Sequence, residues 1–301
     1  MKKITALMLM VVLAGCQVRD QQLQSATTSS IAQSGPEIAA DLTARYNDVR
    51  INCGSPSTPA FLCSGIILRS TVHGPGYFFW NPSPHSQQSG GVSFSYLRKD
   101  AKFQKLVFGQ NNGFVFYPVF NTPPGKEHIE ILCSYPIDGW TQLRETPGCG
   151  AHPYYPTQSK RCQTMGISTA EQWMAHWNAA PSSAYRPAYQ CSFDVRDSMN
   201  QLAADSFYQS LRTRNLLGAT WFPQQNELIL RTWAQTDNPN GLPIQALFYT
   251  GDGLSNARKD QVHFRNQSGD VLPIIKLTLP TNSSENAVFT YDPNDLDPSI
   301  P

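Results

Sequence analysis

The chain contains 301 residues, with 23 Lys or Arg against 22 Asp or Glu, so its formal net charge is +1 and only 15% of its residues are charged. A soluble protein usually carries about 25%. Apolar residues make up 40% and aromatic residues 11%, which excludes a chain that is disordered throughout. The near-zero net charge excludes a nucleic-acid binder that works by bulk electrostatics, because there is no excess of cations to displace counterions.

Residues 1–15 predict an export signal. Two lysines precede an apolar run, Ile4–Leu13, which is too short for a membrane-spanning helix of about 20 residues. The sequence Leu13-Ala14-Gly15-Cys16 resembles the lipobox of bacterial lipoproteins, in which the cysteine is lipidated and becomes the mature N-terminus. Because Gln17 follows the cysteine, the lipobox indicates an exported protein held at the outer membrane by its lipid alone. An ordinary cleavable signal with a chance cysteine, and hence a periplasmic or secreted protein, is the alternative.

Residues 16–35 are rich in Gln, Ser, Thr and Ala and predict a flexible tether. A single domain is expected over residues 36–291, with a loose tail over residues 292–301. Ser34 and Glu37 form a capping box for a helix that runs to about Arg50. A second capping box, Ser168–Glu171, predicts a helix that carries two tryptophans on one face, and a third helix is expected over about residues 197–215.

Strand patterns dominate the remaining chain and are separated by turns rich in Pro, Gly and Asn. We expect strands at Phe61–Thr71, Val92–Leu97, Gly113–Phe120, Ile129–Cys133, Glu227–Trp233, Ile244–Tyr249 and Leu272–Leu279. Few helices among many strands indicate an α+β protein with a mostly antiparallel sheet.

Six cysteines follow Cys16, and an even number in an exported chain predicts disulfides. Many pairings are possible; the spacing suggests three local loops, Cys53–Cys63, Cys133–Cys149 and Cys162–Cys191. A zinc site is the rival interpretation, which is weakened because no Cys-x-x-Cys occurs and the six histidines are scattered.

Three strand motifs carry candidate chemistry, in a sequence without a nucleophile elbow, a zincin motif, a P-loop or a Rossmann glycine pattern. Arg69 ends an apolar strand, and a guanidinium suits a phosphate group. Ser93 and Ser95 alternate with bulky residues after two glycines, so they share one face of a strand. Glu227 opens another apolar strand, with Gln225 on the same face.

An Arg on one strand, Ser-x-Ser on a second and Gln-x-Glu on a third resemble the arginine–serine–glutamate class of mono-ADP-ribosyltransferases. Across most of residues 36–290, including Trp80–Pro84 and Gly90–Arg98, the chain also resembles the halovibrin family of exported bacterial proteins, which is associated with ADP-ribosyltransferase and NAD glycohydrolase activity. The resemblance implies a split β-sandwich with a few helices and a disulfide-stapled insertion. It also implies an enzyme that cleaves the nicotinamide–ribose bond of NAD, with no cofactor beyond NAD as substrate and with water or a protein side chain as acceptor.

The resemblance gives the carboxylate side of the site these roles. Glu227 would stabilise the positive charge of an oxocarbenium-like transition state, as a carboxylate does in glycoside cleavage. Ser93 would hold Glu227 by a hydrogen bond. Gln225 would orient the acceptor, and Phe222 or Trp221 would contact that acceptor or cover the site.

On the NAD-binding side, the resemblance assigns Arg69 to the phosphates and Ser95 to the support of the strand or of the nicotinamide pocket. The sequence departs from the family in having Ser-Phe-Ser where Ser-Thr-Ser is usual. It also has a long stretch between Ser95 and Glu227 that contains four of the six cysteines. Gln225 stands where the arginine-modifying members have Glu, which favours another acceptor or hydrolysis.

A non-enzymatic interpretation stays open. Each motif alone is more often structural: an Arg at a strand end is ordinarily solvated, and alternating serines usually form the exposed face of an edge strand. The alternative function is an outer-membrane lipoprotein that binds an envelope glycan or a protein partner through a disulfide-stapled module. Convergence of Arg69, Ser93 and Glu227 on one cleft would favour the enzyme, whereas their placement on different faces would favour the binding module.

Overall fold

The computed structural model describes residues 34–71, 91–140, 149–150, 161–196, 200–231 and 241–300. The expected signal, Cys16, all but the end of the expected tether and the Trp80–Pro84 segment lie outside these ranges. Residues 33–301 form one compact unit. Within the described ranges this unit is an α+β structure with a mixed nine-stranded sheet, which confirms the expected class.

The sheet has the strand order β5-β4-β6-β2-β1-β3-β7-β8-β9. Every neighbouring pair is antiparallel except β7 and β8, which are parallel. The strands are β1 (Ile66–Ser70), β2 (Val92–Leu97), β3 (Asn112–Phe116), β4 (Ile131–Tyr135), β5 (Phe193–Asp194), β6 (Glu227–Leu230), β7 (Ile244–Tyr249), β8 (Ile274–Thr278) and β9 (Val288–Tyr291).

Some expected strands are shorter than their apolar runs. The run from Phe61 to Thr71 begins with a 3-10 turn, Ala60–Leu62, and becomes extended only at Ile66. The run from Gly113 to Phe120 likewise ends in a 3-10 turn, Val119–Asn121. In both cases buried apolar side chains continue into the turn, so burial alone does not mark where a strand stops.

The α-helices of the described ranges are α1 (Gly35–Asn47), α3 (Ala170–Asn178), α4 (Gln201–Trp221) and α5 (Leu254–Ser268). The capping box of α1 is the expected one, and that of α3 lies one residue later than expected, at Thr169 and Gln172. The sequence did not predict α5. This helix buries only two apolar side chains, Ala257 and Phe264, beside two polar ones, so it lacks a clear apolar stripe.

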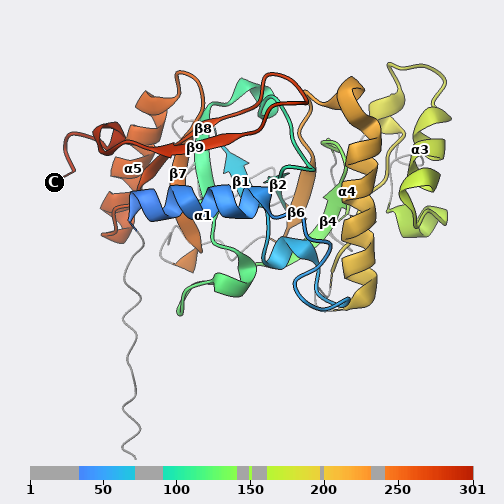
Figure 1. Cartoon of the computed structure of the whole chain (residues 1–301), viewed down its shortest axis with the longest axis horizontal. Coiled ribbons are helices and arrows are strands. Elements are labelled where there is room, and N and C mark those ends of the chain that lie inside the picture. The colour runs from blue at the N-terminus through green and yellow to red at the C-terminus, as the bar shows by residue number, and fades with distance from the viewer. Residues whose placement is uncertain are drawn as a thin grey trace, which may run out of the picture. The chain divides into compact units, whose positions relative to one another are not determined.

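The two faces of the sheet are covered by different helices. On one face, α1 crosses the strands (Figure 1) and packs in an apolar cluster from β1, β3, β7, β8 and β9. On the other face, α5 covers β3, β7 and β8, and α4 lies along β4 and β5. The aromatic rings of Phe94, Phe114 and Phe116 pack against one another on this second face and connect β2 to β3.

Strand β2 changes partners half-way along its length. Its first half, Val92–Phe94, pairs with Leu228–Leu230 of β6. Its second half, Ser95–Leu97, pairs with Ile66–Leu68 of β1. The ladder with β6 ends at Phe94, and the ladder with β1 begins at Ser95. Strand β2 therefore connects the part of the sheet that contains β5, β4 and β6 to the part that contains β1, β3, β7, β8 and β9.

A side chain takes the place of the missing ladder. The Tyr96 N–H donates to Oδ1 of Asn226 at 2.8 Å, and Nδ2 of Asn226 donates to the Tyr96 carbonyl oxygen at 2.8 Å. Both residues are buried. The carboxamide of Asn226, the residue directly before β6, therefore bonds the backbone of β2 as another peptide group would.

The replacement Asn226→Ala tests this bridge. Two buried backbone groups of Tyr96 would lose their partners, so we expect the free energy of unfolding to fall by about 2–4 kcal/mol in urea titrations. The exposed Asn266 of α5 supplies the control Asn266→Ala, which should change stability by less than about 0.5 kcal/mol. Equal stability of the two variants would contradict the bridge.

Residues 161–196 form a small core of their own with the end of α4. Trp173 and Trp177 are fully buried and stacked, and Trp221 packs edge-on against Trp177. The Cys162–Cys191 disulfide lies in this core. Cys53–Cys63 and Cys133–Cys149 are also bonded, so all three expected pairs are confirmed.

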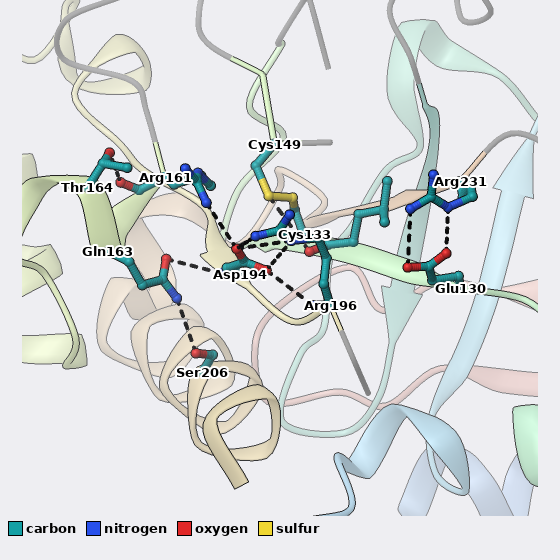
Figure 2. Close-up of polar contacts among 11 residues, drawn as sticks. Glu130, Cys133, Cys149, Arg161, Gln163, Thr164, Asp194, Arg196, Ser206 and Arg231 are labelled. Carbon is teal, nitrogen blue, oxygen red and sulfur yellow. Dashed lines mark hydrogen bonds and ion pairs between the residues drawn. A yellow bond between two sulfur atoms is a disulfide. The ribbon is translucent and has the colours of Figure 1, made fainter. Parts of the chain in front are cut away.

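Asp194 of β5 is the polar centre that joins this segment to the sheet edge (Figure 2). It pairs with Arg196 at 2.6 Å and with Arg161 at 3.3 Å, and its N–H donates to Oε1 of Gln163. Burial raises the pKa of Asp194, but the hydrogen bonds from Arg196 and the charge of that residue outweigh burial and bring the pKa below its ordinary value. The folded state thus favours the ionised carboxylate.

The pH dependence of stability follows from this shift. Ionised Asp194 stabilises the fold above its unfolded pKa of about 4, and this contribution disappears as the pH falls through the lower pKa of the folded state. We expect Asp194→Asn to lose about 2 kcal/mol at pH 7 and to approach the unmodified protein below about pH 4. Urea unfolding at several pH values measures this, with the exposed Asp205→Asn as control. A difference that does not vary with pH would contradict it.

The described C-terminal residues, 292–300, make hydrogen bonds with β7 and α5. The Tyr249 hydroxyl donates to Asp295, and the Arg258 side chain donates to the carbonyl oxygens of Asn294 and Asp295. The Asp297 N–H donates to Gln261 of α5. The composition of this segment is typical of a flexible tail, and its hydrogen bonds to distant residues offset the entropy lost when it is ordered.

Candidate functional site

The three sequence motifs lie on neighbouring strands. Arg69 is on β1, Ser93 and Ser95 are on β2, and Glu227 opens β6, in the sheet order β6-β2-β1. Arg69 is the first residue of β1 beyond the ladder with β2. The chain therefore gathers these motifs around the place where β2 changes partners.

Ser93, Ser95 and Glu227 share one face of the sheet. Ser93 pairs with Ile229, and the same register continued by one pair places Ser95 opposite Glu227. This polar row separates the apolar cluster under α1 from the cluster of Ile229 with the Cys133–Cys149 disulfide. The serine directly across from Glu227 is thus Ser95, whereas the resemblance implied Ser93.

Glu227 is buried, with 1% of its surface exposed. The Gly139 N–H donates to Oε2 of Glu227 at 2.9 Å. This backbone donor and the pairing of β6 together fix the direction of the carboxylate.

Gln225 is buried as well and is held at both its backbone and its side chain. The Val107 N–H donates to its Oε1 at 3.2 Å, and the Asp138 N–H donates to its carbonyl oxygen at 2.9 Å. Residues 137–140 therefore touch both members of the Gln-x-Glu pair, and the loop after β2 touches one of them.

Arg69 lies on the other face of the sheet. Its guanidinium is 5.8 Å from the centre of the Phe94 ring, and Phe94 belongs to the opposite apolar cluster from the serines. Beside it, a Cβ at Gly113 of β3 would collide with the Arg69 carbonyl oxygen, so only glycine permits this close approach. The structure brings Ser95 and Glu227 together on one face and leaves Arg69 on the reverse.

The aromatic residues expected to contact an acceptor differ in their exposure. Phe222 is buried, with 8% of its surface exposed. Trp221 packs edge-on against Trp177 of the small core and is only partly buried.

Two exposed aromatic residues that the sequence interpretation missed flank the Gln-x-Glu pair. Phe108 follows Val107 directly and is 85% exposed, and Trp140 follows Gly139 and is 56% exposed. Their φ angles are 53° and 43°, and they are the non-glycine residues in the described ranges with positive φ. Strained backbone of this kind is concentrated at functional sites. An aromatic beside a loop glycine, as in Phe108-Gly109 and Gly139-Trp140, is the signal that could have pointed to them.

A hollow of about 120 Å³ lies near the start of β4 and the end of β6. Its lining includes Glu127, His128, Glu130 and Arg231. Burial raises the pKa of Glu127 above its ordinary value. Glu130 and Arg231 form an ion pair at 2.5 Å (Figure 2), so their charges offset each other.

The described ranges hold no group of three or more His, Cys, Asp or Glu side chains arranged to bind a metal ion. None of their helices combines the length and the apolar character needed to cross a bilayer.

No protein-family model matches this chain, and no curated protein matches it. The motifs and their geometry are therefore what bears on function.

The replacement Phe108→Gly tests whether the exposed Phe108 ring contributes to the stability of the fold. Glycine adopts positive φ without strain, and the exposed ring contributes little burial, so we expect the free energy of unfolding to change by less than about 1 kcal/mol. In the same loop, Phe103 is fully buried, and Phe103→Ala should cost about 3–5 kcal/mol. Denaturant titration compares the two. A loss above about 2 kcal/mol for Phe108→Gly would mean that the ring is packed in solution.

Proposed function

We propose that this protein is an exported enzyme that cleaves the nicotinamide–ribose bond of NAD, with water favoured as the acceptor over a protein side chain. The observation that carries the proposal is the register that sets Ser95 opposite Glu227 on one face, at the place where β2 passes from β6 to β1. Motif residues far apart in the chain thereby share one small part of the sheet.

The chemistry assigned to Glu227 fits a carboxylate held in this way. Loss of nicotinamide leaves positive charge on the ribose carbon and ring oxygen, and an adjacent carboxylate stabilises that charge more in the transition state than in the ground state. A buried setting strengthens the interaction because the local dielectric constant is low. The Gly139 amide keeps the carboxylate oriented, so little reorganisation is needed.

The remaining roles follow the same arrangement. Ser95 would bond Glu227 or the nicotinamide amide, and Ser93 would lie further along the same face. Gln225, fixed by the amides of Val107 and Asp138, would orient the attacking water. Arg69 lies on the other face of the sheet beside Phe94, so the proposal gives it no part in this arrangement.

At the level of the fold, the change of partners along β2 supports a split β-sandwich, the architecture of the ADP-ribosyltransferase class. Three disulfides support export to an oxidising compartment. We extend the proposal to a lipid anchor at Cys16 and an outer-membrane location, which rest on the lipobox in the sequence.

A second candidate function is a non-enzymatic binding module for an envelope glycan or a protein partner. It is favoured by a specific observation: Gln225 and Glu227 are 4% and 1% exposed, and Arg69 is on the other face. In that case the polar row would serve the fold, and binding would use the exposed Phe108 and Trp140.

Nicotinamide release from NAD by the full-length protein, purified in detergent, distinguishes the two functions. We expect turnover, a loss of roughly 100- to 1,000-fold in kcat for Glu227→Gln, and a smaller loss for Ser95→Ala. The Gln side chain still accepts from Gly139, so the fold should be kept. Glu130→Gln, which changes a partly exposed carboxylate directly before β4, is the control and should retain full activity.

Absence of nicotinamide release by the unmodified protein, or equal rates for Glu227→Gln and the unmodified protein, would overturn the enzyme proposal. The binding module would then be the better interpretation.

A further inference from the structure

Arg214, near the end of α4, is buried and donates to the backbone at four places. Its guanidinium donates to the carbonyl oxygens of Lys102, Pro136, Phe222 and Gln224. The Lys102 bond is 2.7 Å and the Phe222 bond 3.2 Å. These carbonyls belong to three segments far apart in sequence: the loop after β2, the end of β4 and the turn before β6.

The same three segments hold the Gln-x-Glu pair. The loop after β2 contains Val107, whose amide bonds Gln225. The segment after β4 contains Asp138 and Gly139, whose amides bond Gln225 and Glu227. The turn bonded by Arg214 at Phe222 and Gln224 leads directly into Gln225. One side chain thus connects the segments that contain Val107, Asp138 and Gly139 with the turn that leads into Gln225.

The chemistry of Arg214 differs from that of the other fully buried arginines in the described ranges. Arg45 pairs with Asp41, and Arg98 pairs with Asp100, so each has a carboxylate within 3.0 Å. The hydrogen bonds of Arg214 go to carbonyl oxygens, and burial lowers its pKa to about 10. Burial of a cation costs free energy, and the planar fork of five donors is what can reach several carbonyls at once.

We propose that Arg214 is a positioning residue of the NAD-cleaving site, which sets the placement of Gln225 and Glu227 by joining the three segments around them. This inference rests on the proposed function for its catalytic consequence. Nη2 of Arg214 contacts the carbonyls of Lys102, Phe222 and Gln224, and Nη1 contacts that of Pro136. Lysine retains the charge, but its single nitrogen cannot occupy both positions. A small displacement of a catalytic group can cost about 100-fold in rate.

The test compares Arg214→Lys with Arg212→Met in the full-length protein. Arg212 lies two residues earlier on the same helix and forms an exposed ion pair with Glu171, so it is a matched control. For Arg214→Lys we expect kcat for nicotinamide release to fall by about 10- to 100-fold while KM for NAD changes less than about threefold. In the Glu227→Gln background, Arg214→Lys should cause a smaller loss than in the unmodified protein, because part of its effect acts through the Glu227 carboxylate. Arg212→Met should leave kcat unchanged.

Amide hydrogen exchange gives a readout that does not need activity. Arg214→Lys should speed exchange at the Val107 and Gly139 amides, and Arg212→Met should not. Faster exchange at these amides in a protein that releases no nicotinamide would support the positioning role and count against the proposed function. If the Lys variant does not fold, Arg214→Gln replaces it in both measurements.

Three outcomes would overturn the inference. One is reduced thermal stability of Arg214→Lys with unchanged kcat in the folded protein. Another is a full additive loss of kcat in the Glu227→Gln background. The third is unchanged exchange at the Val107 and Gly139 amides.

Discussion

The division of β2 between two partner strands is the constraint on which the sheet depends. A strand in an antiparallel sheet normally pairs along its whole length on each edge, because unpaired buried backbone groups cost free energy. Here β6 pairs with the first half and β1 with the second, and the Asn226 carboxamide bonds the Tyr96 backbone where β6 has ended. This bridge leaves Ser93 and Ser95 on either side of the change of partners and places Glu227 beside it.

Buried arginines hold the irregular parts of the structure around that strand. Arg45 fastens α1 to β7 through Gln245, and Arg98 bonds Asp100, the Arg50 carbonyl and Ser64. Arg214 donates hydrogen bonds to the backbone of the segments around Gln225. The chain carries few charges, and several of its cations are buried as donors to the backbone, so composition alone understates their role. Guanidinium groups suit this use because they present several donors in a fixed plane.

The candidate site combines two buried polar side chains with two exposed aromatic side chains that lie beside the residues bonded to them. Glu227 and Gln225 are buried and held by backbone amides, whereas Phe108 and Trp140 are exposed within two residues of those amides. The hydrogen bonds from Val107, Asp138 and Gly139 therefore link the backbone beside each exposed ring to the buried pair.

The sequence by itself determined the elements whose signals are local. Alternation and flanking turns predicted β2 and β7 with their observed bounds, the Ser34 capping box gave the start of α1, and close spacing suggested the three disulfides. The tertiary structure decided what depends on distant partners. The polar helix α5 is stabilised by packing against the sheet, β9 forms by pairing with β8, and the tail is held by α5. Strand register also decides on which face of the sheet Arg69 and Glu227 lie. Packing across the sheet decides that Gln225 and Phe222 are buried. Periodicity reports how residues alternate along one strand, but not which strand pairs with it or at what register, and those two choices fix which side chains meet.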